Sequence, residues 1–430
     1  MGNFFHIPHF VVLLVALLAA LQAVRVIYHK VLAVALLKGI VDNPNARKRQ
    51  KEPIPVLGGM AVFFGMLVGM MTFMGLTYAA YLLGDHAPTM YPVLASMGKQ
   101  LPLFLGCVVM LYVGSLDDIL GLTPRARVAA EIFVILAMIY GSGICIDSFH
   151  GLWGVGKISW WVGVPLSVLT GVGLINAYNM VDGVNGLSSG LCMFGSVSLA
   201  FVFYRRGDYP NCSTALCFGA SLLPFFLHNV FGRRSRMYIG DAGSMVMGLL
   251  VTWFVMRVMS TAKINPMEGL PDALPPNMGL CAMLLAITSV PVFDTLRVMT
   301  GRMLHGRSPF KADRTHLHHM FVDSNVTHAN TTMCEVGINI LILGIWYVTY
   351  RCGMDVTWQL YTVMAAGVLL VWGTYFFLRK QRKHNTALLR DTLQVGMRER
   401  LGNGPILKRI ERFMDRKCMR DERKTTDWTD

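Results

Sequence analysis

Long apolar segments dominate this sequence and decide what it can fold into. Each has about 17 to 25 residues, the length of helix that crosses roughly 30 Å of hydrocarbon. Lipid offers no partners to backbone N–H and C=O groups, and the segments are too long and too uniformly apolar for barrel strands, so helices are expected. Eleven spans are predicted, at about 10–36, 56–83, 100–116, 127–144, 160–178, 187–204, 213–231, 243–258, 279–298, 333–350 and 358–378.

The composition excludes other classes of protein. Of the 430 residues, 54% are hydrophobic and 15% are charged, and the mean hydropathy is +0.48. A soluble core cannot absorb so much apolar sequence, and the low content of charged residues also excludes a disordered chain. The nine cysteines form no C-x-x-C pair, so neither a disulfide framework nor a zinc knuckle is indicated. An all-α integral membrane protein is predicted, whose first apolar segment is a retained span and not a signal peptide.

Basic residues are distributed unequally between the two sets of loops. About 30 Lys and Arg fall on one set and about 7 on the other. Because cytoplasmic loops carry the excess of Lys and Arg, the N-terminus is predicted outside and the C-terminus in the cytoplasm. The net charge of +14 then follows from topology and the membrane surface, and no nucleic-acid partner is expected.

The composition changes abruptly near residue 380. Residues 1–379 are predicted to form a polytopic membrane domain, whereas residues 380–430 contain 14 Lys and Arg and 8 Asp and Glu. Apolar residues in this basic tail fit two short amphipathic helices, hinged at residues 402–405. We expect the tail to lie on the anionic inner leaflet, with a solvated flexible tail as the alternative.

Acidic residues gather at the predicted cytoplasmic ends of the spans. Charged side chains are costly in the bilayer centre, so their placement is informative. The adjacent carboxylates of Asp117 and Asp118 repel each other and need a cation, a proton or basic neighbours such as Arg125 and Arg127. A simple surface pair is the alternative. Glu131, four residues after Arg127, is expected to pair with it along a helix.

Amide and acidic side chains recur before the sixth predicted span. Asn176, Asn179, Asp182 and Asn185 are spaced by three residues, which on a helix places them on one face. A polar face at a span end costs stability unless it binds a ligand. Turn formation explains Asp182 and Asn185, each followed by glycine, but not the two upstream asparagines. At the eighth span, Asp241 suits either a helix N-cap or a Mg²⁺ site beside a phosphate-binding helix start.

The end of the ninth span is rich in cations and histidines. Basic residues beside an acidic cleft suit a substrate that carries phosphates. Zinc binding is an alternative for the pattern H-x-H-H, but no Cys lies near. A plain cytoplasmic loop explains the arginines but not the clustered histidines. The residues concerned are Asp294, Arg297, Arg302, Arg307, Lys311, Arg314, His316, His318 and His319.

Five sequence segments, taken in their order along the chain, resemble motifs of the polyprenyl-phosphate N-acetylhexosamine-1-phosphate transferases. They are SLDDILGL (115–122), NAYNMVDGVNGL (176–187), GDAGS (240–244), PVFDTLRV (291–298) and RTHLHH (314–319). The resemblance covers about residues 50–325, and the HLHH pattern is similar to the branch that uses UDP-N-acetylglucosamine. The branch that uses UDP-N-acetylmuramoyl-pentapeptide matches less well, and the basic tail is longer than the family pattern.

The resemblance implies an enzyme of the bacterial inner membrane with a cytoplasmic active site. Its reaction joins undecaprenyl phosphate to the sugar 1-phosphate of a UDP-HexNAc and releases UMP, as the first membrane step of a cell-surface polysaccharide. Both reacting groups are anionic, so Mg²⁺ is expected to relieve their repulsion, with Mn²⁺ as an alternative. Direct displacement and a phosphorylated Asp are both open as mechanisms.

The resemblance and the one-sided carboxylates together suggest residue roles. Asp241 is expected to bind the metal, and Asp117 or Asp118 to support it or to take a proton from the lipid phosphate. The remaining residues are assigned to substrate: Asn176, Asn179, Asp182 and Asn185 to the nucleotide pocket, Asp294 to its surroundings or the metal site, and Arg302, Arg307, Arg314, His316, His318 and His319 to the diphosphate or the sugar.

A transporter or channel is the alternative from a different class, because polar groups in spans often mark a permeation path. That reading predicts ionisable residues near the bilayer midplane, whereas here the polar motifs gather at one face. Within the transferase reading, a different UDP-HexNAc donor is the alternative. Membrane lipids are expected partners, and a homodimer is compatible with the sequence.

Overall fold

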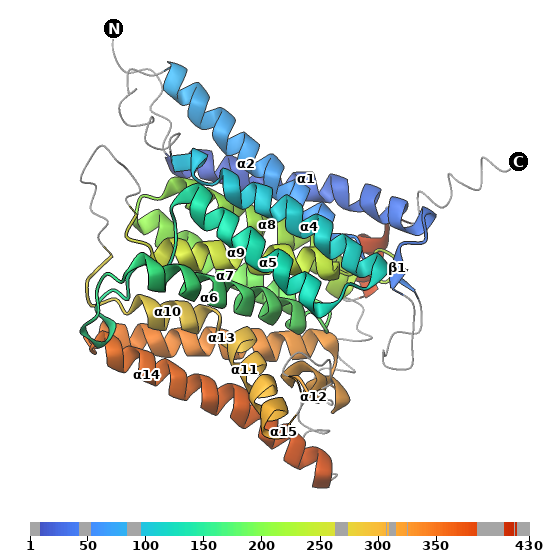
Figure 1. Ribbon diagram of the computed structural model, residues 1–430. Helices are drawn as coiled ribbons and strands as arrows, with labels where there is room; N and C mark the ends of the chain where they lie inside the picture. The colour runs from blue at the N-terminus through green and yellow to red at the C-terminus, as the bar shows by residue number, and fades with distance from the viewer. Residues whose placement is uncertain are drawn as a thin grey trace, which may run out of the picture.

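The protein is a bundle of long helices that run side by side (Figure 1). The computed structural model describes residues 9–42, 53–83, 96–262, 274–306, 308, 315–324, 326–384, 408–416 and 418. The first half contains α1 (His9–Leu37), β1 (Val41–Asp42), β2 (Ile54–Pro55), α2 (Gly58–Leu83), α4 (Leu101–Leu120), α5 (Pro124–Ser142), η1 (Leu152–Gly154), α6 (Trp160–Val181) and α7 (Leu187–Arg205).

The second half is also helical. It contains α8 (Tyr209–Phe231), α9 (Gly240–Met259), α10 (Leu280–Ile287), α11 (Ser289–Leu304), α12 (Leu317–Asp323), α13 (His328–Arg351), α14 (Val356–Gly367), the π-helical η2 (Val368–Trp372) and α15 (Gly373–His384). In the part of the chain that the structure describes, nine helices are long and apolar enough to cross a membrane, or ten if a bent pair counts as one span. The prediction of a helical, multi-pass membrane protein is confirmed, and the count of eleven and the sidedness stay predictions.

Two predicted spans explain the difference in count. The fourth is the helix α5, which is not among the nine and carries Arg125, Arg127 and Glu131. The ninth is broken into α10 and α11, which meet at an angle of 79°. Pro291 lies just after the break, and its ring is incompatible with a straight helix through the carbonyl of Ile287 four residues earlier.

Asn339 of α13 satisfies the backbone groups that the break between α10 and α11 releases. Its amide nitrogen donates to the carbonyl oxygens of Ala286 (3.3 Å) and Ile287 (2.8 Å). Its amide oxygen accepts from the Ser289 hydroxyl and the Val290 N–H, each at 3.0 Å. A broken helix survives in lipid only where such partners exist, so this one side chain makes the bend possible.

The helix α9 lies inside the bundle, with α1 and α2 on one side and α13 and α14 on the other (Figure 1). Its whole apolar window is buried by protein. Glycines allow the close approach: a Cβ on Gly114 of α4 would lie 2.3 Å from Cα of Ala242, and one on Gly59 of α2 would lie 2.3 Å from Cα of Gly243. Small residues at such crossings are the usual means of packing helices in lipid.

Two short strands lie at one end of the bundle. β1 and β2 pair in antiparallel fashion there, and Tyr238, just before α9, donates its N–H to the carbonyl of Pro55 in β2 at 2.7 Å. Of the two helices expected in the basic tail, residues 408–416 are helical. The expected hinge at 402–405 and the first tail helix lie outside the described residues.

Candidate active site

Asp118 holds the beginning of α9. Its Oδ1 accepts from the backbone N–H of Asp241 (3.0 Å) and its Oδ2 from that of Ala242 (3.3 Å). The sequence allowed Asp241 to be the N-cap of this helix, and the structure corrects that reading: Ile239 occupies the N-cap position, and a carboxylate from α4 binds the exposed amides. An anion is favoured at a helix N-terminus, where the amide dipoles point outward. The carboxylate of Asp241 is therefore not used for capping.

Asn179 connects three helices at the same end of the bundle. Its Nδ2 donates to Asp241 Oδ1 at 2.6 Å and to Ser244 Oγ at 2.8 Å. Its Oδ1 accepts from Arg127 Nη2 at 2.8 Å, and Arg127 Nη1 lies 2.9 Å from Asp117 Oδ2. Residues from α4, α5, α6 and α9 thus form one connected polar chain, in which each hydrogen-bonding group has a defined direction.

The helix spacing predicted an ion pair between Glu131 and Arg127, and the structure does not contain it. Glu131 is fully buried and accepts from Nδ2 of Asn176 at 2.6 Å, one helical turn deeper than Asn179. Arg127 faces Asp117 and Asn179 instead, because both lie at the same end of the bundle as the first turn of α5. The helical pairing rule applies to exposed surfaces, and this one faces another helix.

Four regularly spaced residues were expected on one helix face, but only two of them lie on a helix: Asn176 and Asn179 do, and Asp182 and Asn185 do not. α6 ends at Val181, so Asn176 and Asn179 share its last turns while Asp182 and Asn185 lie in the following turn. Oδ1 of Asp182 accepts from the Ser188 hydroxyl at 2.5 Å, and the N–H of Asn185 donates to His328 Nδ1 at 3.3 Å.

The electrostatic surroundings of Asp182 favour its neutral form. Burial raises the pKa of Asp182 to about 8; the hydrogen bond from Ser188 opposes the rise, and the carboxylates of Asp241 and Asp118 add to it. The carboxylates at the start of α9 therefore disfavour a negative charge on Asp182.

Asp294 fixes the histidine segment. Its Oδ2 is hydrogen-bonded to His316 Nδ1 at 2.7 Å, and its Oδ1 accepts from the N–H of Leu317 at 3.0 Å and from Arg297 Nη2 at 2.7 Å. Arg297 also donates to the carbonyl of Thr315 at 2.5 Å. Both carboxylate oxygens are therefore used to hold the start of α12, so Asp294 is a positioning group in this arrangement.

His318 links the histidine segment to the turn after α6. The side chain is buried, and neither ring nitrogen has a hydrogen-bond partner among the described residues. A Cβ on Gly183 would lie 2.5 Å from His318 Nε2, so the turn that carries Asp182 passes directly against this ring. Burial lowers the pKa of His318, and the neighbouring His319 and His316 lower it further. A neutral imidazole with two unsatisfied nitrogens is prepared to hydrogen-bond a ligand.

The structure describes only some of the basic residues and histidines that were predicted to contact the substrate. Arg302 is buried in the last turn of α11. Arg307 and Arg314 lie outside the described residues, so their assignment to the diphosphate stays a prediction. His319 is partly buried in the first turn of α12, with its ring centroid 4.3 Å from that of His318.

Four further residues hold the site, and the sequence analysis gave none of them a catalytic or substrate-binding role of its own. Ser188 and Ser244 are small polar groups that carry no distinctive pattern. Arg127 was expected as a basic neighbour of Asp117 and Asp118, and its ion pair with Asp117 confirms this. Only three residues separate α4 from α5, so the end of the first helix and the start of the second must be neighbours. Arg297 was grouped with the cations that suit a phosphate-bearing substrate, whereas in the structure it pairs with Asp294, three residues earlier on the same helix.

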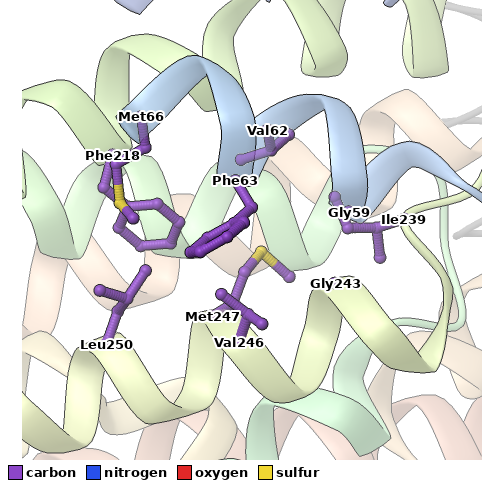
Figure 2. Close-up of a pocket in the computed structure, with 10 residues that line it drawn as sticks. All are labelled: Gly59, Val62, Phe63, Met66, Phe218, Ile239, Gly243, Val246, Met247 and Leu250. Atoms are coloured by element: carbon purple, nitrogen blue, oxygen red, sulfur yellow. The ribbon is translucent and has the colours of Figure 1, made fainter. Parts of the chain in front are cut away.

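A small apolar pocket lies between α2, α8 and α9 (Figure 2). Every residue that lines it is apolar, so it offers no partner to a charged reactant. The lining consists of Gly59, Val62, Phe63, Met66, Phe218, Ile239, Gly243, Val246, Met247 and Leu250.

Three carboxylates were predicted to bind or support a metal, and their contacts differ. Asp117 forms an ion pair with Arg127 and accepts a hydrogen bond from the N–H of Leu122 (2.7 Å). Both carboxylate oxygens of Asp118 accept hydrogen bonds from backbone amides at the start of α9. Asp241 accepts from Asn179 through Oδ1. Among the described residues, no group of three or more His, Cys, Asp or Glu side chains is placed to hold a metal. Mg²⁺ commonly takes one or two carboxylates with waters and substrate phosphates, which fits Asp241 best.

Comparison with known proteins gives a consistent result. Residues 100–259 match glycosyl transferase family 4. The chain is 28% identical over 303 residues to the undecaprenyl-phosphate alpha-N-acetylglucosaminyl 1-phosphate transferase of Yersinia pestis, covering 68% of this chain and 72% of that protein. The Escherichia coli K12 protein of the same name is 28% identical over 299 residues, 67% of this chain and 71% of that protein.

A relative with slightly lower identity covers more of the chain. The probable undecaprenyl-phosphate N-acetylglucosaminyl 1-phosphate transferase of Bacillus subtilis is 26% identical over 317 residues, which is 74% of this chain and 79% of that protein. The segment that matches the family runs from α4 to α9 and includes α4, α5, α6 and α9, whose polar side chains converge at the site. The chain is thus similar to glycosyl transferase family 4 over these helices, and to proteins named as N-acetylglucosaminyl 1-phosphate transferases over about two thirds of its length.

Proposed function

We propose that the protein transfers N-acetylglucosamine 1-phosphate from UDP-N-acetylglucosamine to undecaprenyl phosphate. The products are undecaprenyl-diphosphate-N-acetylglucosamine and UMP, and the reaction takes place at the cytoplasmic face of a bacterial inner membrane. The names of the relatives support the acceptor and the sugar. Another UDP-HexNAc or UDP-N-acetylmuramoyl-pentapeptide is the alternative donor.

One observation carries the proposal: the polar chain from Asp117 through Arg127 and Asn179 to Asp241, which joins four helices at one end of the bundle. Transfer between two phosphates needs alignment and neutralisation of charge more than it needs covalent help from the protein. A rigid chain of alternating charges and amides provides both. A permeation path would instead need these groups along the length of the bundle.

Each residue of the hydrogen-bonded series from Asp117 to Asp241 has a proposed role. Asn179 orients the Asp241 carboxylate by donating to Oδ1, which leaves Oδ2 for a cation. Mg²⁺, when bound there, would neutralise charge on the phosphates, and Mn²⁺ is the alternative ion. Asp117 and Asp118 remain candidates for taking the proton of the lipid phosphate. Each must first give up a present contact, to Arg127 or to the amides of α9.

The histidine segment is proposed to contact the donor. Neutral His318 is placed to donate to a phosphate or sugar oxygen, since both ring nitrogens lack a partner in the described part of the protein. His316 is oriented by Asp294, and His319 packs beside both rings. Arg302, Arg307 and Arg314 are proposed to hold the diphosphate, because guanidinium groups bind phosphate oxygens in pairs.

A transfer assay in detergent tests the proposal. Purified protein is incubated with undecaprenyl phosphate and radiolabelled UDP-N-acetylglucosamine, and lipid-linked label is extracted. We expect Mg²⁺-dependent transfer, its loss in EDTA, and slower transfer from UDP-N-acetylgalactosamine or UDP-N-acetylmuramoyl-pentapeptide. No transfer from any of these donors would exclude the proposed function, and full transfer in EDTA would exclude the metal.

Two matched substitutions sharpen the assay. Asp241→Asn removes one charge from the proposed cation ligand and should reduce transfer by at least about 10³-fold at any Mg²⁺ concentration. Asp355→Asn removes one charge at the N-cap of α14, where the side chain accepts from the N–H of Thr357 and asparagine caps equally well. This control should transfer at the wild-type rate. A normal rate for Asp241→Asn would refute the role of Asp241.

A further inference from the structure

Asp415 in the basic tail is buried against the segment that precedes α9. Only 5% of the residue is exposed, in a tail rich in charged side chains. Its carboxylate accepts from three consecutive backbone amides, those of Arg233 (3.3 Å), Arg234 (3.1 Å) and Ser235 (3.0 Å), and from the Ser235 hydroxyl (2.8 Å). Consecutive amides that converge on one anion are a specific binding arrangement, and a buried carboxylate needs such partners.

Ser235 is also held from the other side. Its carbonyl accepts from the Tyr28 hydroxyl at 2.7 Å, and its hydroxyl lies 3.0 Å from His228 Nδ1. The rings of Tyr28 and His228 are stacked with centroids 4.6 Å apart. The tail, α1 and α8 therefore meet at a single residue, six positions before Asp241.

The segment from Ser235 onward sets the position of the start of α9. Asn229 donates to the carbonyl of Met237 at 2.8 Å, and Tyr238 pairs with Pro55. Gly240 then takes φ +76°, and a Cβ there would lie 2.7 Å from Oδ2 of Asp118. The path from Ser235 to Asp118 leaves little freedom, so a shift of Ser235 displaces the first turn of α9.

We propose that Asp415 is a positioning residue for the active site: by binding the amides of residues 233–235, the tail holds the start of α9 and the carboxylate of Asp241 in place. The effect on transfer rests on the proposed function, whereas the docking of the tail does not. Basic side chains of the tail helix, such as Arg409 and Arg412, are exposed and can contact anionic lipid while Asp415 is docked.

Hydrogen–deuterium exchange of the full-length protein reads the docking directly. In Asp415→Ala, the amides of residues 233–235 should exchange at least about tenfold faster, because each loses its acceptor. Asp415→Asn keeps one acceptor oxygen and should give an intermediate rate. Glu411→Gln, one turn earlier on the same helix and partly exposed, removes the same charge and should leave these amides unchanged.

Steady-state kinetics read the positioning role. Asp415→Ala should lower kcat by about 10-fold to 100-fold, the cost of a small misplacement of reacting groups, with little change in KM for the UDP-sugar. The thermal unfolding midpoint should stay close to that of the wild type, and Asp415→Asn should restore part of the rate. Glu411→Gln should behave as wild type in both measurements.

Each outcome bears on one proposal. Unchanged exchange at residues 233–235 in Asp415→Ala would overturn the docking, and faster exchange with an unchanged kcat would overturn the positioning role. If the alanine variant does not fold, the asparagine variant decides both points. A wild-type protein that transfers no sugar phosphate would refute the proposed function, while the exchange data would still report on the tail.

Discussion

At the scale of residues, the amide of Asn179 has a demanding role, because it must donate to Asp241 and Ser244 while accepting from Arg127. A carboxylate cannot donate, so Asn179→Asp would place two like charges about 2.6 Å apart. We predict that Asn179→Asp lowers kcat more than Asn179→Ala, with losses of about 10³-fold and 10²-fold. Transfer kinetics test the order. Equal rates in the two variants would show that orientation of Asp241 does not matter.

Asp182 predicts a pH dependence of stability. Its pKa of about 8 lies above the ordinary value of 3.8, so the folded protein binds the proton more tightly than the unfolded chain. This contribution to the free energy of unfolding is complete below about pH 4 and is lost as the pH rises to about 8. Asp182→Asn should therefore lose less stability than the wild type across this window.

Thermal unfolding in detergent with EDTA, followed between pH 5 and 8.5, measures this difference. Asp355→Asn serves as the control, and its midpoints should run parallel to those of the wild type. Parallel curves for Asp182→Asn as well would mean that Asp182 is ionised throughout the range.

The convergence of the polar residues at one end of the bundle was more predictable than their hydrogen-bond partners. Asp117, Asp118, Asn179 and Asp241 were expected to converge because each lies at the same predicted end of a span, and the structure brings them together. The pairings depend on how each helix is rotated about its axis, which no local pattern specifies. Glu131 shows the limit, since spacing along α5 favoured Arg127 and packing against α6 selected Asn176.

At the scale of elements, the crossings of α9 depend on residues without side chains. A side chain at Gly114 would meet backbone atoms of Ala242, which cannot move aside as a flexible side chain can. We predict that Gly114→Val separates α4 from α9 and destabilises the protein by roughly 1–3 kcal/mol or more. It should also lower transfer, since Asp118 on α4 caps α9.

The matched control for Gly114→Val is Gly173→Val. Gly173 lies in α6, and a Cβ added there would have no atom of the described residues within 4 Å, so valine has room. Thermal unfolding and transfer rates of the two variants should differ, with Gly173→Val close to the wild type. A Gly114→Val protein as stable as the control would contradict the packing of α9.

Spans were predicted well because the length and composition of an apolar helix are local properties. The break between α10 and α11 was missed although Pro291 lies beside it. A proline is not a sufficient signal, since Pro224 lies inside the continuous helix α8. What decides is whether another helix supplies partners for the released backbone groups, and Asn339 on α13 does so from about fifty residues away.

At the scale of the whole molecule, two native cysteines test the predicted sidedness. Cys352 is exposed after α13, at the end of the bundle away from the site, and Cys418 lies in the tail at the site end. With the site end in the cytoplasm, an impermeant maleimide should label Cys352 in intact cells and Cys418 only in inverted vesicles. Cys352→Ser and Cys418→Ser assign the signals. Labelling of Cys418 from outside would reverse the topology.

The burial of α9 has a consequence for how the protein responds to its membrane. Bilayers of different thickness act on proteins by tilting the helices that touch acyl chains, and the perimeter of this bundle absorbs such changes. A helix that is buried by protein along its apolar length responds to such changes only through the helices around it. The carboxylate that matters most to the proposed chemistry is mounted on that buried helix, so the catalytic geometry is shielded from the lipid in which its own substrate is dissolved.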